Sequence, residues 1–167
     1  MDRQLCSMMA GVTGAGALTL VHQMARSMTP HAPRMDVLGI RALRAAHRQL
    51  GGGVPSDRTL EREALTGDLV ANAAWYSLVG AGSRANVWRR GVALGLVAGL
   101  GAILLPKPLG LGQPPNAERH STQLMTIGWY VIGGLAAAAA FAARGRDATD
   151  MLPASPHRRP LARHASR

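Results

Sequence analysis

Residues 66–82 decide how the chain folds, and they read TGDLVANAAWYSLVGAG. The segment is apolar enough to enter a bilayer, yet it carries Asp68, Asn72 and Tyr76 at intervals of four residues. On an α-helix these three side chains share one face. Polar groups at membrane depth face protein or a water-filled cavity rather than lipid. The stretch therefore predicts a membrane helix whose polar face is covered by the rest of the chain.

The composition agrees with a membrane protein. Hydrophobic residues make up 47% of the chain and charged residues only 17%, while aromatic residues contribute 4%, with a single Phe. Such a chain lacks large side chains for a soluble core, and its many small residues suit helices that pack closely in lipid. The basic residues that give the net charge of +10 lie in segments between hydrophobic runs. This placement is typical of membrane-flanking arginines, so we expect no nucleic-acid partner.

Four hydrophobic runs are long enough to cross, or nearly cross, a hydrocarbon core of ~30 Å. They predict an all-α bundle of four transmembrane helices within a membrane domain at residues 1–144. A basic, proline-containing tail follows at 145–167, which we expect to be disordered and solvated, with anionic lipid or a partner as its alternative contact. The predicted spans lie at about residues 5–24, 64–82, 91–105 and 122–143.

Between the first two spans, residues 36–50 have helical periodicity but are too short and too charged to cross a membrane. Asp36 is the expected N-cap of this helix. We interpret the segment as a short amphipathic helix in the interface, with a basic face toward anionic headgroups. A helix docked on a soluble partner is the alternative interpretation. The basic face consists of Arg41, Arg44 and Arg48.

Small residues at intervals of four mark the helix-packing faces. Such faces let two backbones approach closely in a bilayer. Three glycines in the third predicted span form two overlapping motifs of this kind, and the first and fourth spans carry milder versions. The predicted packing residues are Gly11, Ala15, Gly91, Gly95, Gly99, Gly133 and Ala137.

The chain also shows a possible internal duplication. Aligning Trp75-Tyr76 with Trp129-Tyr130 repeats the polar face, and sliding the first span onto the third sets Gly11 against Gly91. Each half would then be a small-faced helix followed by a Trp-Tyr helix. Two spans per half give both copies the same orientation in the membrane.

Polar residues near the ends of three spans form a candidate cluster at one face of an up-down bundle. In one interpretation these groups satisfy each other and water. In the functional interpretation, Asp68 pairs with Arg26 or His22 and the cluster binds an ion, a proton or a small solute. Haem ligation by two histidines is disfavoured because neither lies mid-span. The cluster comprises His22, Arg26, Asp68, Asn72, His120, Thr122 and Thr126.

The chain has no phosphate-binding loop, no His-Glu-x-x-His and no Gly-x-Ser-x-Gly. We therefore expect no catalytic residue, no metal and no cofactor. The favoured function is a structural or accessory subunit that packs against other membrane subunits or its own copies. A small transporter or channel lined by Asp68 and Asn72 is the main alternative, and a membrane enzyme acting on a lipid comes third.

Residues 32–39, APRMDVLG, are followed by a TGDLV span. This sequence pattern resembles that of a group of small, uncharacterised bacterial polytopic membrane proteins, and the resemblance covers much of the chain outside the tail. The resemblance implies no activity, cofactor or site. We expect the bacterial cytoplasmic (inner) membrane as the location. The short basic connection at 82–90 predicts both termini in the cytoplasm, whereas Arg26 and Arg34 favour the opposite orientation.

Overall fold

The chain folds into α-helices joined by short connections in the computed structural model, which describes residues 2–150. No strand occurs in this range, so the all-α prediction is confirmed. Residues 145–150, predicted to begin the tail, instead continue the last helix, and the rest of the tail lies outside the described residues. The helices are α1 (Arg3–Met28), α2 (Met35–Gln49), α3 (Asp57–Ser77), α4 (Val87–Leu104) and α5 (His120–Asp150), with the short 3-10 helices η1 (Leu78–Gly80) and η2 (Arg84–Asn86) between α3 and α4.

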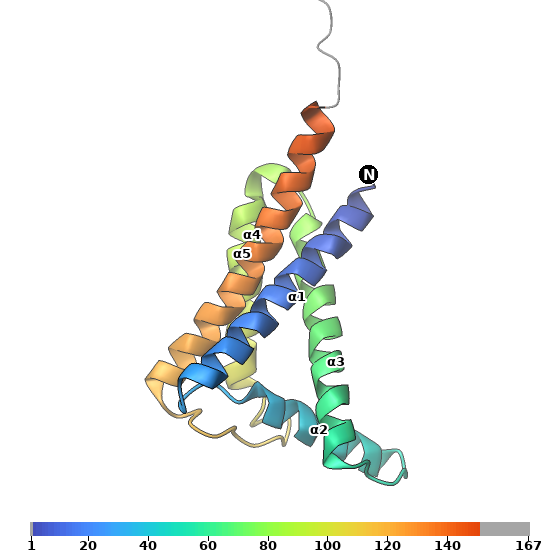
Figure 1. Cartoon of the computed structure of the whole chain (residues 1–167), viewed down its shortest axis with the longest axis vertical. Helices are drawn as coiled ribbons and strands as arrows, with labels where there is room; N and C mark the ends of the chain where they lie inside the picture. The colour runs from blue at the N-terminus through green and yellow to red at the C-terminus, as the bar shows by residue number, and fades with distance from the viewer. Residues whose placement is uncertain (1, 151–167) are drawn as a thin grey trace, which may run out of the picture.

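The long helices alternate in direction along the chain (Figure 1). The helix pairs α4 and α5, α1 and α5, and α1 and α3 pack along one another. The helix α2 lies across the end where α1 and α4 finish, and it contacts α3. We call this end the α2 end, and the opposite end, which holds the start of α1 and the η1–η2 connection, the N-terminal end.

Three helices are long and apolar enough to cross a membrane, at Arg3–Met28, Arg84–Leu104 and His120–Arg144. They contain the predicted spans 5–24 and 122–143 and all but the last residue of 91–105, and they make the chain a multi-pass membrane protein. The helix α3 is not among them. Its first turns carry Asp57, Glu61 and other charged residues, which lower its mean hydropathy.

Helix starts follow local capping in two cases. Asp2 accepts a hydrogen bond from the backbone N–H of Gln4 at α1, and Ser56 accepts one from Thr59 at α3. The expectation that Asp36 caps α2 is wrong, because the N-cap position is occupied by Arg34, two residues earlier, and no side chain caps the helix. The carboxylate of Asp36 is engaged by arginines instead, as described below.

Close backbone contact joins α4 to α5. A Cβ atom added to Gly91 would lie 2.5 Å from the carbonyl oxygen of Gly134, and one added to Gly95 would lie 2.5 Å from the Cα of Val131. Gly99 approaches the Cα of Ile127 in the same way. The structure therefore places all three predicted glycines of the α4 segment on the surface that meets α5.

The predicted small residues of α1 and α5 also lie at helix contacts. A Cβ atom on Gly11 would collide with the carbonyl oxygen of Ala73 on α3. The ring of Tyr76 lies against Gly133, while Ala15 and Ala137 are fully buried. The side of α1 that carries Gly11 and Ala15 thus faces α3 and α5.

The two helix pairs do not share the register that the aligned sequences suggest. Gly11 meets Ser77 on α3, and Ser77 aligns with Val131 of α5. The glycine that meets Val131 is Gly95, one turn beyond the position aligned with Gly11. Duplication remains a prediction, and the contacts of Gly11 correspond to those of Gly95 and Gly99, one and two turns beyond the aligned position.

We predict that Gly91→Ala lowers stability in detergent, because the new methyl group meets a backbone oxygen that cannot move without displacing α5. Overpacking of this kind costs about 1–3 kcal/mol. Gly128→Ala is the matched control, since a Cβ atom there has no neighbour within 4 Å. Thermal unfolding of both variants measures the effect, and equal melting temperatures would contradict the close approach of α4 and α5.

Candidate functional site

The predicted polar residues lie on three helices, and those of α1 and α5 lie toward the α2 end of the bundle. His22 and Arg26 lie in the last turns of α1, and His120 begins α5. Thr122 and Thr126 follow in the first turns of α5, whereas Asp68 and Asn72 lie in the second half of α3. The up-down arrangement therefore brings the residues of α1 and α5 to one end, whereas Asp68 and Asn72 lie in the half of α3 that leads away from it. The contacts of these residues divide them into separate groups.

Arg26 belongs to an ion-pair group with the start of α2. Its Nη2 lies 3.3 Å from Asp36 Oδ2, and Arg34 Nη2 lies 3.0 Å from the same oxygen. Burial acts to raise the pKa of Asp36, but the hydrogen bond from Arg34 and the charges of Arg26 and Arg34 outweigh it and hold the pKa below its ordinary value. The same contacts raise the pKa of Arg34. This group fixes the turn between α1 and α2.

Asp68 and Asn72 form a second group within α3. The side-chain amide of Asn72 donates to both the backbone carbonyl and the Oδ1 of Asp68, each at 2.9 Å. Among the described residues, Asp68 forms no ion pair, and the partner of Arg26 is Asp36. The predicted pairing of Asp68 with Arg26 or His22 is thus not formed, because the first turn of α2 supplies the carboxylate of Asp36 to Arg26.

His22 packs edge-on against aromatic rings of α5. Its ring centroid lies 5.0 Å from that of Trp129 and 6.1 Å from that of Tyr130. The Nε2 of His22 and the Oγ1 of Thr19 are buried and have no hydrogen-bond partner within residues 2–150. Two unsatisfied polar atoms one turn apart on α1 could each bind a water molecule. Thr19 is absent from the predicted cluster, because no sequence pattern shows that a hydroxyl group lacks a hydrogen-bond partner.

The threonines of α5 bond to backbone oxygens. Thr122 Oγ1 donates to the carbonyl of His31 at 3.2 Å, and Thr126 Oγ1 donates to the carbonyl of Thr122 at 2.9 Å. Both threonines, with Met35 and Gln123, line a cavity of about 40 Å³. This volume suits water rather than a larger solute. His120 is exposed, whereas His22 is packed under Trp129, so the two histidines have different surroundings.

Hydrogen bonds from α3 to other helices lie next to this region. Tyr76 Oη donates to the carbonyl of Tyr130 at 2.7 Å, and the contact is buried. Trp75 Nε1 donates to the carbonyl of Leu94 at 3.0 Å. Backbone carbonyls of α4 and α5 thus hold the Trp-Tyr pair of α3, which the sequence marked as a repeated motif and, at Tyr76, as part of the polar face.

The predicted basic face of α2 is partly engaged within the protein. Arg41 Nη1 donates to the carbonyls of Leu111 at 2.9 Å and Gln113 at 3.0 Å. Arg44 lies 2.5 Å from Asp57 at the start of α3. Arg48 is exposed. Two of the three arginines therefore hold α2 against the loop before α5 and against α3.

Among the described residues, no group of three or more His, Cys, Asp or Glu side chains is placed to hold a metal ion. The polar residues of the α2 end instead satisfy one another or backbone carbonyls, apart from the unpaired atoms on α1. No protein-family model, curated protein or solved structure matches the chain. Function is therefore argued from the contacts of this multi-pass helical membrane protein.

Proposed function

We propose that this protein is a non-catalytic accessory subunit of a membrane assembly and that α3 is the helix that meets its partner. The observation that carries the proposal is the one-sided cover of α3. Its inner side packs on α1 and carries Asn72 and Tyr76, whereas Val70 on its outer side and Leu78, which follows α3 in η1, are 62% and 47% exposed.

The outer side of α3 also carries small residues. Gly67 and Ala71, four apart, are exposed, and a Cβ atom on Gly67 has no neighbour within 4 Å. A helix that is less apolar than the spans gains less from lipid, so protein cover stabilises it more. The partner we infer is a membrane helix, from another subunit or from a second copy of this chain.

We expect the tagged protein to co-purify with a second membrane subunit, or with itself, in a mild detergent. Gly67→Leu places a large side chain on the outer side of α3 and should abolish this association without touching the chain's own core. Gly128→Leu is the matched control on α5, because this glycine is also exposed without neighbours. Recovery of the wild type as a single monodisperse bundle, or equal loss with both variants, would count against the proposal.

A small transporter or channel is the second candidate, and the unpaired polar atoms of Thr19 and His22, buried on α1, are the observation that favours it. The small volume of the cavity beside Thr122 and Thr126 favours the accessory-subunit function over transport. In proteoliposomes containing a pH-sensitive dye, we expect the wild type to carry no more protons than empty vesicles under a potassium diffusion potential. Proton flux that Asp68→Asn abolishes would instead establish the transporter.

We further propose that α3 crosses the bilayer as a fourth span, that α2 lies in the interface and that both termini are cytoplasmic. Arginines support this orientation, because Arg3, Arg84 and Arg144 stand where the three candidate spans reach the N-terminal end of the bundle. At the α2 end, Arg26 is paired with Asp36. Positive residues beside span ends favour the cytoplasmic side.

Cysteine accessibility tests this topology in a Cys6→Ser background. Gln49→Cys and Ser83→Cys lie before and after α3, so a spanning α3 places them on opposite sides of the membrane. We expect an impermeant maleimide added outside intact cells to label the former and not the latter. Labelling of both from one side would refute the fourth span, and labelling of Ser83→Cys alone would reverse the orientation.

A further inference from the structure

The N-terminal end of the bundle gathers arginines at the depth of lipid headgroups. Candidate spans begin at Arg3 and Arg84, and the third ends at Arg144. Figure 1 shows the start of α1, the η1–η2 connection and the upper part of α5 at this same end. Charged residues at span ends lie at the boundary between the hydrocarbon core and the phosphate groups of the lipids.

Two of these arginines bind the connection after α3. Arg3 donates to the carbonyl of Gly80, through Nε at 3.1 Å and Nη2 at 2.8 Å, and also to the carbonyl of Gly82. Arg90 Nε donates to the carbonyl of Val79 at 3.0 Å, while its Nη2 is buried without an acceptor. Two guanidinium groups thus converge on one short turn.

Arg84 adds a third positive charge beside them. Its guanidinium lies 5.3 Å above the ring centroid of Phe141. The Phe141 ring also lies close to Gly80, since a Cβ atom added to Gly80 would be 3.0 Å from Phe141 Cε2. Gly80 is the residue whose carbonyl accepts from Arg3. We call Arg3, Arg84 and Arg90 the arginine cluster.

Among the described residues, the arginine cluster forms no ion pair with a carboxylate. All four ion pairs within that range lie at the α2 end. Carbonyl oxygens satisfy hydrogen bonds but carry no net charge, so the cluster retains about three positive charges at close range. An anion at this position would relieve their mutual repulsion.

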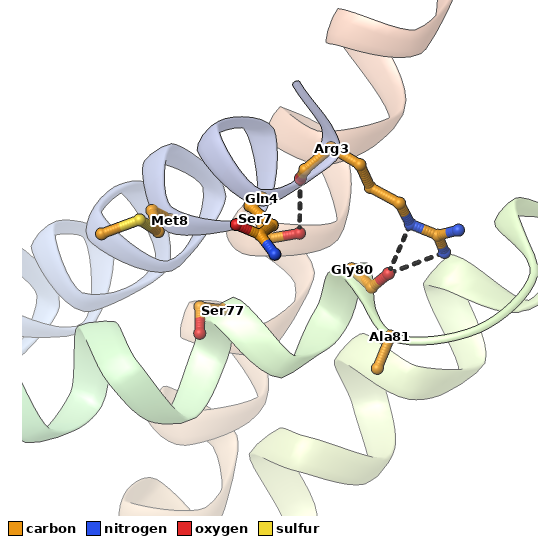
Figure 2. A pocket seen from close by; sticks show the side chains of 7 residues that line it. All are labelled: Arg3, Gln4, Ser7, Met8, Ser77, Gly80 and Ala81. Carbon is orange, nitrogen blue, oxygen red and sulfur yellow. Dashed lines mark hydrogen bonds between the residues drawn. The ribbon is translucent and has the colours of Figure 1, made fainter. Parts of the chain in front are cut away.

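A groove opens beside the cluster, between the first turns of α1 and the end of α3 (Figure 2). Its volume is about 440 Å³. Arg3 Nη1 makes no hydrogen bond within the described chain, which leaves its two N–H groups for a ligand. Met8, which is 64% exposed, supplies an apolar wall further along α1. The groove is lined by Arg3, Gln4, Ser7, Met8, Ser77, Gly80 and Ala81.

We propose that the groove and the arginine cluster bind an anionic phospholipid from the adjoining leaflet. The guanidinium groups hold the headgroup phosphate, and the acyl chain lies along the apolar surface of α1 beyond Met8. A charged head joined to an apolar tail matches this order of cationic and apolar surfaces. Arg41 and Arg44 of α2 are engaged within the protein, so the lipid-binding arginines lie at the end opposite to the one that the sequence suggested.

The proposal is independent of the accessory-subunit function, and its test uses the full chain purified in detergent. Native mass spectrometry with phosphatidylglycerol and phosphatidylcholine of equal acyl length measures lipid binding. We expect the wild type to retain phosphatidylglycerol preferentially. Arg84→Gln removes a charge that makes no hydrogen bond within the described chain, so the fold should survive while binding weakens about fivefold. Arg3→Gln should have at least this effect.

Arg48→Gln is the matched control, since it removes an exposed arginine at the α2 end and should leave binding unchanged. Three outcomes would overturn the proposal. These are equal retention of the two lipids by the wild type, an equal loss of binding in Arg48→Gln and Arg84→Gln, and displacement of phosphatidylglycerol by millimolar inorganic phosphate. The last outcome would assign the groove to a soluble anion rather than to a lipid.

Discussion

The contact between the backbones of α4 and α5 is the constraint on which the rest of the bundle depends. In lipid, apolar side chains gain little by meeting each other rather than acyl chains, so dispersion forces between closely packed backbones hold helices together. Gly91 and Gly95 permit that approach because they present no Cβ atom to Gly134 and Val131. With α5 held in this way, its other side forms the surface on which α1 packs through Gly14.

The helix α3 is held by a different kind of interaction. Its backbone approaches α1 at Gly11, but its links to α4 and α5 are side-chain hydrogen bonds from Trp75 and Tyr76 to main-chain carbonyls. Such bonds fix the rotation of a helix, since each donor reaches its acceptor in one orientation only. The fixed rotation turns Asn72 inward and leaves Gly67 outward. The polar face and the proposed partner face of α3 thus follow from the same two bonds.

Hydropathy and spacing predicted the features that depend on local sequence. The three apolar helices, α2 at nearly its full length and the contact role of Gly91 belong to this class, because composition and periodicity determine them. The pairings were beyond prediction. The sequence around Asp36 is typical of a helix cap, but in the folded chain this carboxylate pairs with Arg26. The sequence likewise predicts Arg41 to be a surface charge, but in the folded chain it donates to carbonyls of the loop before α5. The shifted register of Gly11 likewise depends on how far each helix slides past its neighbour.

The hydrogen bonds of α3 also bear on the order in which the chain is built. During synthesis, α3 leaves the ribosome before the carbonyls that accept from Trp75 and Tyr76 exist, since those carbonyls belong to α4 and α5. The amino-terminal half therefore emerges with its indole and phenol donors unsatisfied, and it acquires its final arrangement only when the last helix arrives. Water, lipid headgroups or the insertion machinery would satisfy these two donors until α4 and α5 are in place.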